Sequence, residues 1–121
     1  MPKIKQATLE SIIIAAQNTY PDEFIALLGA DKKKVIKELV ILPSTYGSTF
    51  SSIRRDLVPF DSSIVGSVHS HPSHSNRPSS GDLKAFPGMG EVHLIICMPF
   101  DLNSIKAYDV KGNELEIEAV E

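Results

Sequence analysis

The first hydrophobic positions of the chain recur about every 3.6 residues, which is the period of an α-helix. The apolar side chains that share this period are Ile4, Ala7, Ile12, Ala15 and Ala16. Polar residues such as Gln6, Glu10 and Gln17 lie elsewhere on the helical surface. Pro21 follows the segment, and proline cannot continue a helix. The pattern therefore predicts an amphipathic helix over residues 4–19.

The next two apolar stretches have the length of β-strands. Residues 23–28 form an apolar run that ends at Gly29, and residues 35–42 form a second run rich in β-branched side chains. The charged segment Asp31-Lys32-Lys33-Lys34 lies between them. Two strand-like runs joined by a short polar segment are typical of a hairpin. We therefore expect the three lysines to lie in a solvated turn.

The second half of the chain indicates more strands and one short helix. The expected strands span residues 51–57, 64–70, 92–98, 104–109 and 114–119, and the helix lies around residues 80–86. Residues 44–52, rich in Ser, Thr and Gly, are typical of a loop. In the last strand Leu115, Ile117 and Ala119 alternate with glutamates, which indicates one face in water. The element order predicts an α/β fold, a mixed β-sheet packed by a long N-terminal helix and a short second helix.

The composition places the chain among ordinary globular proteins. Its 121 residues are 42% hydrophobic and 22% charged, which favours a single domain spanning residues 1–121. The net charge of −3 provides no basic excess for binding nucleic acid. No apolar run reaches the roughly 20 residues of a membrane span. The N-terminal residues do not resemble a signal peptide, so we expect a cytoplasmic protein without membrane or nucleic-acid partners.

Two histidines separated by one residue mark the end of the strand expected over residues 64–70. They are His69 and His71, followed by Pro72. Residues i and i+2 of a strand point to the same face, with Cα atoms roughly 6.6 Å apart. Both imidazoles can therefore converge on a metal ion, and the loop after Pro72 leads to Asp82 as a third candidate ligand. Two histidines and one carboxylate leave one zinc position open for water, as in catalytic sites.

The same residues also have a purely structural interpretation. A His-x-His pair on a buried strand can be a hydrogen-bonded part of the core. The segment Ser79-Ser80-Gly81-Asp82 matches a capping box, in which the serine and the acidic residue satisfy the first amides of a helix. Capping and metal binding are compatible, because a cap fixes the start of the helix and thereby holds Asp82 in place.

Taken together, these residues resemble the JAMM motif of the MPN-domain metallopeptidases. The motif consists of His69-x-His71-Pro72, six further residues, and Ser79-x-x-Asp82. It also requires a glutamate on an early strand, and Glu23 falls in the matching place within a similar pattern of proline and apolar residues. The resemblance covers essentially the whole chain. It implies the cytidine-deaminase-like α/β fold of that family.

The resemblance also implies a role for each residue of the motif. His69, His71 and Asp82 would bind Zn²⁺, which lowers the pKa of bound water to about 7. Glu23 would act as the general base, taking the proton from this water and passing it to the leaving amine. Ser79 would help to stabilise the oxyanion. The leaving group in the family is typically a lysine ε-amine, so the implied reaction is isopeptide hydrolysis.

Other candidate chemistry is weaker. His74 and His93 are further potential metal ligands, but the site already has three, and we expect His74 on an exposed loop. The single cysteine, Cys97, lies in an apolar run and is expected to be buried. One cysteine also excludes a disulfide framework within the chain and a cysteine-based zinc finger. The Pro-Cys-x-x-Cys element of zinc nucleotide deaminases is missing from the sequence.

The short chain restricts the substrates that the resemblance implies. Eukaryotic members specific for ubiquitin chains carry insertions, whereas only nine residues separate Asp82 from Val92 here. The chain therefore resembles a minimal archaeal or bacterial-type member. Its expected partner is a small ubiquitin-like modifier whose Gly-Gly tail lies beside an exposed strand, which we place around residues 44–56.

Three functions stay open from the sequence. The first is a zinc isopeptidase that removes ubiquitin-like modifiers from proteins. The second is a hydrolase that trims the C-terminus of a ubiquitin-like sulfur-carrier protein. The third is a non-catalytic MPN scaffold, although such relatives lose motif residues that this chain keeps. The oligomeric state, including a homodimer, also stays open.

Overall fold

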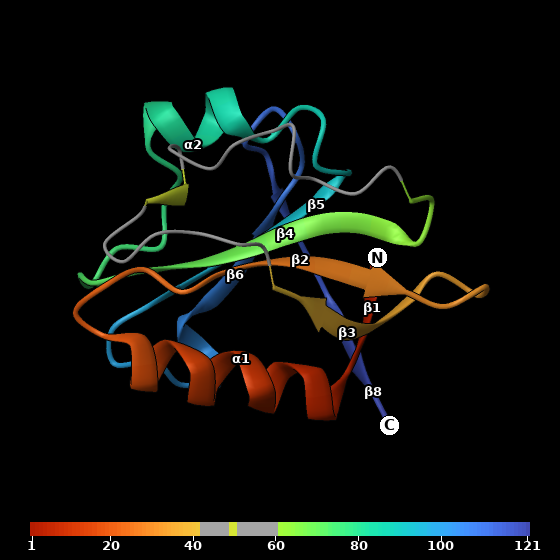
Figure 1. The fold of residues 1–121 in the computed structure, drawn as a ribbon, viewed down its shortest axis with the longest axis horizontal. Coiled ribbons are helices and arrows are strands. Elements are labelled where there is room, and N and C mark those ends of the chain that lie inside the picture. The colour runs from red at the N-terminus through yellow and green to blue at the C-terminus, as the bar shows by residue number, and fades with distance from the viewer. Residues whose placement is uncertain (42–48, 51–60) are drawn as a thin grey trace.

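The computed structural model describes residues 1–41, 49–50 and 61–121. Its elements are β1 (Lys3–Lys5), α1 (Gln6–Thr19), β2 (Ile25–Ala30), β3 (Val35–Val40), β4 (Ile64–His71), α2 (Ser80–Ala85), β5 (Val92–Cys97), the 3₁₀ helix η3 (Leu102–Ser104), β6 (Ile105–Tyr108), β7 (Glu114–Leu115) and β8 (Glu118–Val120). Helix α1 covers one face of the sheet and α2 covers the other (Figure 1). The predicted α/β architecture is confirmed.

The sheet is mixed and strongly curled. Its strand order is β7-β6-β5-β4-β2-β3-β1-β8. Strands β4 and β5 are parallel, whereas β2 is antiparallel to both β3 and β4. Strands β7 and β8 lie at opposite edges, although only Glu116 and Ile117 separate them in the chain. Such a connection reaches roughly 10 Å, whereas seven strand spacings make roughly 34 Å. The sheet therefore has to curl until its two edges approach each other.

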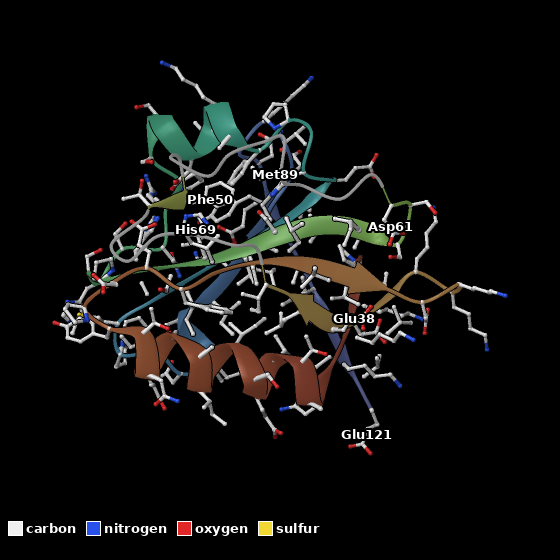
Figure 2. All side chains as sticks on the ribbon, viewed as in Figure 1. Glu38, Phe50, Asp61, His69, Met89 and Glu121 are labelled. Atoms are coloured by element: carbon white, nitrogen blue, oxygen red, sulfur yellow. The ribbon has the colours of Figure 1, made fainter. Side chains whose placement is uncertain are left out.

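Side-chain alternation along the central strands divides the core into two layers. On β4, Val68 packs into the cluster that contains the buried residues of α1. The next side chain, His69, points to the opposite layer, where its ring stacks on Phe50. That second cluster contains Phe86 and Ile95 and lies on the side of α2 (Figure 2). Both histidines of the candidate site therefore belong to the α2 side of the sheet.

The predicted hairpin over residues 23–42 is confirmed, with β2 and β3 pairing antiparallel. Asp31 shapes the turn, because its Oδ1 accepts hydrogen bonds from the backbone N–H groups of Lys33 and Val35 at 2.9 and 3.0 Å. Lys34 adopts the left-handed conformation, with φ of 64°. The three lysines of the turn are exposed, as expected for a solvated segment.

The predicted start of the first helix is wrong by two residues. Ile4 and Lys5 belong to strand β1 rather than to the helix. Ile4 lies opposite Ile36 of β3 and Ala119 of β8, and its side chain is fully buried. Ile4 is therefore apolar because it occupies a buried position on a strand between β3 and β8. A helical period alone cannot separate this residue from the helix that follows it.

The predicted strand over residues 114–119 is also wrong in its extent. The segment divides into β7 beside β6 and β8 beside β1. Leu115 and Ile117 are partly buried, but Ala119 is exposed and Val120 is covered instead. The strands expected over 64–70, 92–98 and 104–109 and the helix over 80–86 are confirmed within one or two residues. The loop, the strand and the docking edge expected between residues 44 and 57 lie outside the described residues, except for Thr49 and Phe50.

Within the described part of the chain, no helix is both long and apolar enough to cross a membrane.

Candidate metal centre

Three side chains bring potential metal-binding atoms to one point. His69 Nε2 lies 3.1 Å from His71 Nε2 and 3.2 Å from Asp82 Oδ2. His71 Nε2 lies 3.0 Å from the same carboxylate oxygen. The structure thus brings together all three of the ligands predicted from the sequence, and they form a group that could hold a metal ion. Two imidazole nitrogens and one carboxylate oxygen are the donor set of a catalytic zinc site with an open position.

Strand β4 positions the two histidines. It lies in the middle of the sheet, between β2 and β5, and His69 and His71 are opposite Ile95 and Cys97 of β5. A strand with neighbours on both sides has little freedom to shift, because its backbone groups are bonded in two ladders. His69 is fully buried, whereas His71 at the strand end keeps 16% of its side chain exposed. The site therefore opens to solvent at the end of β4.

A backbone carbonyl orients His71. Its Nδ1 lies 2.9 Å from the carbonyl oxygen of Ser75, which can only accept a hydrogen bond. The proton of the neutral ring is therefore on Nδ1, and the lone pair of Nε2 faces the candidate metal position. Metal-binding histidines are commonly fixed in this way by a partner on the other ring nitrogen.

Asp82 has both of the roles considered from the sequence. Its backbone N–H donates to Ser79 Oγ at 3.0 Å, and its Oδ2 accepts the backbone N–H of Ser79 at 2.9 Å. The capping box predicted at the start of α2 is thereby confirmed. The same Oδ2 atom is the one that approaches both histidines. Capping and metal binding are compatible because the cap holds the carboxylate toward the site.

Electrostatic interactions favour an ionised carboxylate in this site. Burial raises the pKa of Asp82, but hydrogen bonds from His69 and His71 outweigh burial and hold the pKa well below its usual value. Burial lowers the pKa of His71, and hydrogen bonds to Asp82 and to the Ser75 carbonyl outweigh it, so this pKa is raised. Before metal binds, His71 and the carboxylate of Asp82 therefore stabilise each other's charged forms.

Glu23 lies beside this group. It precedes β2, and the pairing of Ile25 with His69 continues through Phe24, whose carbonyl accepts the backbone N–H of Ser70 at 2.9 Å. The next position along this antiparallel pair places Glu23 opposite His71. The charge of Glu23 also contributes to the raised pKa of His71. Its Oε1 accepts the backbone N–H of Phe50 at 3.1 Å.

The remaining sequence candidates lie outside the group. His74 is exposed on the loop after β4, as expected. Cys97 is buried, with 5% exposure, and the pKa of its thiol is raised by burial. His93 is fully buried, and it is held by Ser67 Oγ at 2.7 Å and by the carbonyl of Gly90 at 2.9 Å. Among the described residues none of the three joins the metal-binding group.

Phe50 is the residue that the sequence analysis missed. It lies in a Ser/Thr-rich stretch without a regular hydrophobic period, so no local pattern distinguishes it from a surface residue. In the structure its side chain is only 1% exposed and contacts His69 and Phe86. The burial of Phe50 against His69 becomes visible only in the folded structure.

Buried His93 makes stability depend on pH. Burial lowers the pKa of His93 to about 4, despite an opposing hydrogen bond to the Gly90 carbonyl. An unfolded chain's histidine titrates near pH 6.5, so the unfolded state binds more protons between about pH 6.5 and 4. We expect this residue to contribute up to about 3 kcal/mol of stability that is lost as pH falls through that window.

Urea unfolding of metal-free protein at several pH values measures this effect. The variant His93→Gln lacks the titrating group, so its free energy of unfolding should fall less steeply between pH 6.5 and 4 than that of the wild type. The two proteins are otherwise identical, so contributions from the other groups cancel in the comparison. Parallel pH profiles for the two proteins would contradict the assignment.

Comparisons with known proteins agree with this geometry. Residues 5–111 match the Prok-JAB family, the prokaryotic homologs of the JAB domain. A protein of Haloferax volcanii named probable metalloprotease is 33% identical over 123 residues, covering 93% of this chain and 76% of that protein. A solved structure described as JAMM, a metalloprotease-like zinc site in the proteasome and signalosome, is 42% identical, covers 100% of this chain and 99% of that one, and has a TM-score of 0.79.

A JAB1/MPN domain protein from Archaeoglobus fulgidus is 41% identical, with coverage of 100% and 98% of the two chains and a TM-score of 0.79. The curled sheet, the two helices and the His-His-Asp group define a zinc-dependent hydrolase with a JAMM/MPN fold. This chain belongs to the Prok-JAB family, and it is a zinc metallopeptidase with Zn²⁺ as its cofactor.

Proposed function

We propose that this metallopeptidase is an isopeptidase that hydrolyses the bond after the C-terminal glycine of a ubiquitin-like modifier. The observation that carries the proposal is the position of Glu23, which the register of β2 and β4 puts opposite His71, beside the three metal-binding side chains. This arrangement supplies both a metal centre and a separate proton acceptor. The resemblance of the complete motif to the JAMM metallopeptidases supports the choice of substrate class.

His69, His71 and Asp82 would hold the zinc ion. When bound, zinc lowers the pKa of a water molecule and polarises a carbonyl group. Glu23 uses one carboxylate oxygen to accept the Phe50 N–H. A carboxylate has two oxygens with several lone pairs between them, so Glu23 can also accept the proton of the attacking water. It then passes this proton to the leaving lysine amine, as a general base that becomes a general acid.

We propose that Ser79 stabilises the oxyanion of the reaction. Its Oγ accepts the N–H of Asp82, so the hydroxyl proton is left to donate to another group. The residue is exposed at the start of α2, where a substrate carbonyl can approach. A preorganised donor that meets developing negative charge is effective in catalysis. Ser79 therefore caps the helix with its lone pair and would stabilise the oxyanion with its proton.

The substrate assignment is tested with two kinds of conjugate. Zinc-loaded protein is incubated with ubiquitin, or with a prokaryotic ubiquitin-like protein ending in Gly-Gly, joined through an isopeptide bond to a lysine peptide. In parallel, the same modifiers carry extra residues as a linear C-terminal extension. Intact-mass spectrometry identifies the cleaved bond. We expect release of the lysine peptide after the terminal glycine.

The outcome separates the functions that the sequence left open. Cleavage of only the linear extension would favour trimming of a sulfur-carrier protein, since the same metal centre and base serve that reaction. Zinc-loaded protein that cleaves neither conjugate would overturn the proposal. The variant Glu23→Gln serves as the control for contaminating peptidase, because it lacks the proposed base.

A further inference from the structure

Four aromatic rings connect the metal centre to the interior below α2. The Phe50 ring stacks on His69 with centroids 4.2 Å apart and an angle of 5° between the planes. Phe50 also packs against Phe86, with ring centroids 5.8 Å apart and an angle of 59° between the planes. Phe86 in turn stacks on His93 at 4.1 Å and 10°. Figure 2 shows Phe50 and His69 next to each other on the α2 side of the sheet.

The two histidines of the site differ in how their rings are held. The Nδ1 of His71 has the Ser75 carbonyl as its partner at 2.9 Å. The Nδ1 of His69 is buried and has no hydrogen-bond partner within the described ranges 1–41, 49–50 and 61–121. A hydrogen bond at this atom usually fixes the ring of a metal-binding histidine. His69 therefore needs another contact to orient its imidazole.

The torsion that rotates an imidazole ring has broad minima, so the ring is not fixed by its own covalent geometry. A flat ring stacked at 4.2 Å and 5° restricts this rotation, because turning the imidazole would drive its edge into the neighbouring face. Phe50 can do this because it is itself confined. Its side chain is 1% exposed, and Phe86 lies against it.

We propose that Phe50 is a positioning residue for the metal centre, which fixes the imidazole plane of His69 by stacking in place of the missing hydrogen bond. The ring holds Nε2 of His69 toward Nε2 of His71 and Oδ2 of Asp82. The backbone N–H of the same residue donates to Glu23 at 3.1 Å, so Phe50 is anchored at the site from two directions. Phe50 would thus affect metal binding without touching the metal, by orienting His69.

The proposal rests on the zinc centre of the proposed function but not on its substrate. Metal affinity and ligand geometry can be measured without any conjugate. If the protein cleaves no isopeptide conjugate, the metal affinity and ligand geometry still test the Phe50 proposal. If the Phe50 proposal is wrong, the conjugate assay still tests the isopeptidase assignment.

The central variant is Phe50→Leu, which keeps an apolar side chain but removes the flat ring. We measure its zinc dissociation constant by competition with a chelator and the visible absorption of its Co²⁺ form, which reports ligand geometry. Loss of an outer contact to a ligand typically weakens metal binding about 10- to 100-fold. We expect a weakening in this range together with an altered Co²⁺ spectrum.

Two further variants separate positioning from a general loss of packing. Phe50→Tyr keeps the stacking ring and should bind zinc nearly as tightly as the wild type. Phe100→Leu makes the same substitution at a residue of 7% exposure in the cluster on the α1 side. It should lower the stability of the metal-free protein without changing the Co²⁺ spectrum.

The proposal is overturned if Phe50→Leu keeps the zinc affinity and Co²⁺ spectrum of the wild type. It is equally overturned if Phe100→Leu weakens zinc binding as much as Phe50→Leu does. Urea unfolding of each metal-free variant establishes that the chain is folded before metal is added. If Phe50→Leu does not fold, Phe50→Met provides a second side chain without a ring.

Discussion

Replacing Glu23 by glutamine should slow hydrolysis severely while the zinc ion stays bound. Glutamine has almost the same shape, and its carbonyl oxygen can still accept the Phe50 N–H that Glu23 accepts at 3.1 Å. It cannot take a proton from water near neutral pH. General acid–base catalysis by one side chain typically contributes about 10²- to 10⁴-fold to the rate. We expect kcat of Glu23→Gln to fall by an amount in this range.

The measurement combines turnover of the preferred conjugate with zinc content determined on the same sample. A matched control is Glu38→Gln, which makes the same chemical change at an exposed carboxylate of β3. Figure 2 shows Glu38 well away from His69. This control should keep both its zinc and its activity. Zinc-loaded Glu23→Gln with turnover similar to the wild type would exclude Glu23 as the base.

Replacing His71 by alanine should remove zinc from the protein. The substitution deletes one of three converging donors and leaves only His69 and Asp82, whose closest atoms are 3.2 Å apart. Two protein ligands are fewer than the three that catalytic zinc sites use. We therefore expect about one zinc per chain in the wild type and almost none in His71→Ala after dialysis.

Elemental analysis of untagged protein gives this stoichiometry directly. His74→Ala is the matched control, because His74 is the nearby exposed histidine that lies outside the metal-binding group. Bound metal also stabilises the folded state by mass action. A chelator should therefore lower the Tm of the wild type and of His74→Ala but not that of His71→Ala.

The opposite result would change the functional assignment. If the wild-type protein takes up no zinc after reconstitution, the motif serves only to cap the helix. The non-catalytic scaffold would then be the favoured function. Full zinc occupancy in His71→Ala would show that the metal lies elsewhere. Both outcomes can be read from the same set of samples.

The three metal ligands could be predicted from the sequence because local rules orient each of them. Alternation along a strand places His69 and His71 on one face whatever the strand pairs with. The capping box places Asp82 in the first turn of α2 and aims its carboxylate back toward Ser79. Asp31 similarly determines the turn between β2 and β3 through bonds to nearby backbone amides. These effects act within a few residues of the chain.

The errors concern segments whose structure depends on distant neighbours. Ile4 fits the helical period, but it lies in the sheet, where it pairs with Ile36 of β3 and Ala119 of β8. The alternating run near the C-terminus predicts one strand, yet closure of the curled sheet divides it between opposite edges. The local sequence is compatible with the predicted and with the observed structure of these two segments. The structure that forms depends on which strands lie close enough to pair with them.

The class of chemistry follows from the amino-acid sequence, through the types of ligand, their spacing and the cap that holds Asp82. Which side chains pack around the ligands depends on how the whole chain folds. Folding stacks Phe50 on His69 and buries His93 beneath Phe86, and no sequence pattern indicated either contact. The reason is physical: ligand spacing follows from the repeat of a single strand, whereas ring stacking and burial depend on surfaces from segments far apart in the chain.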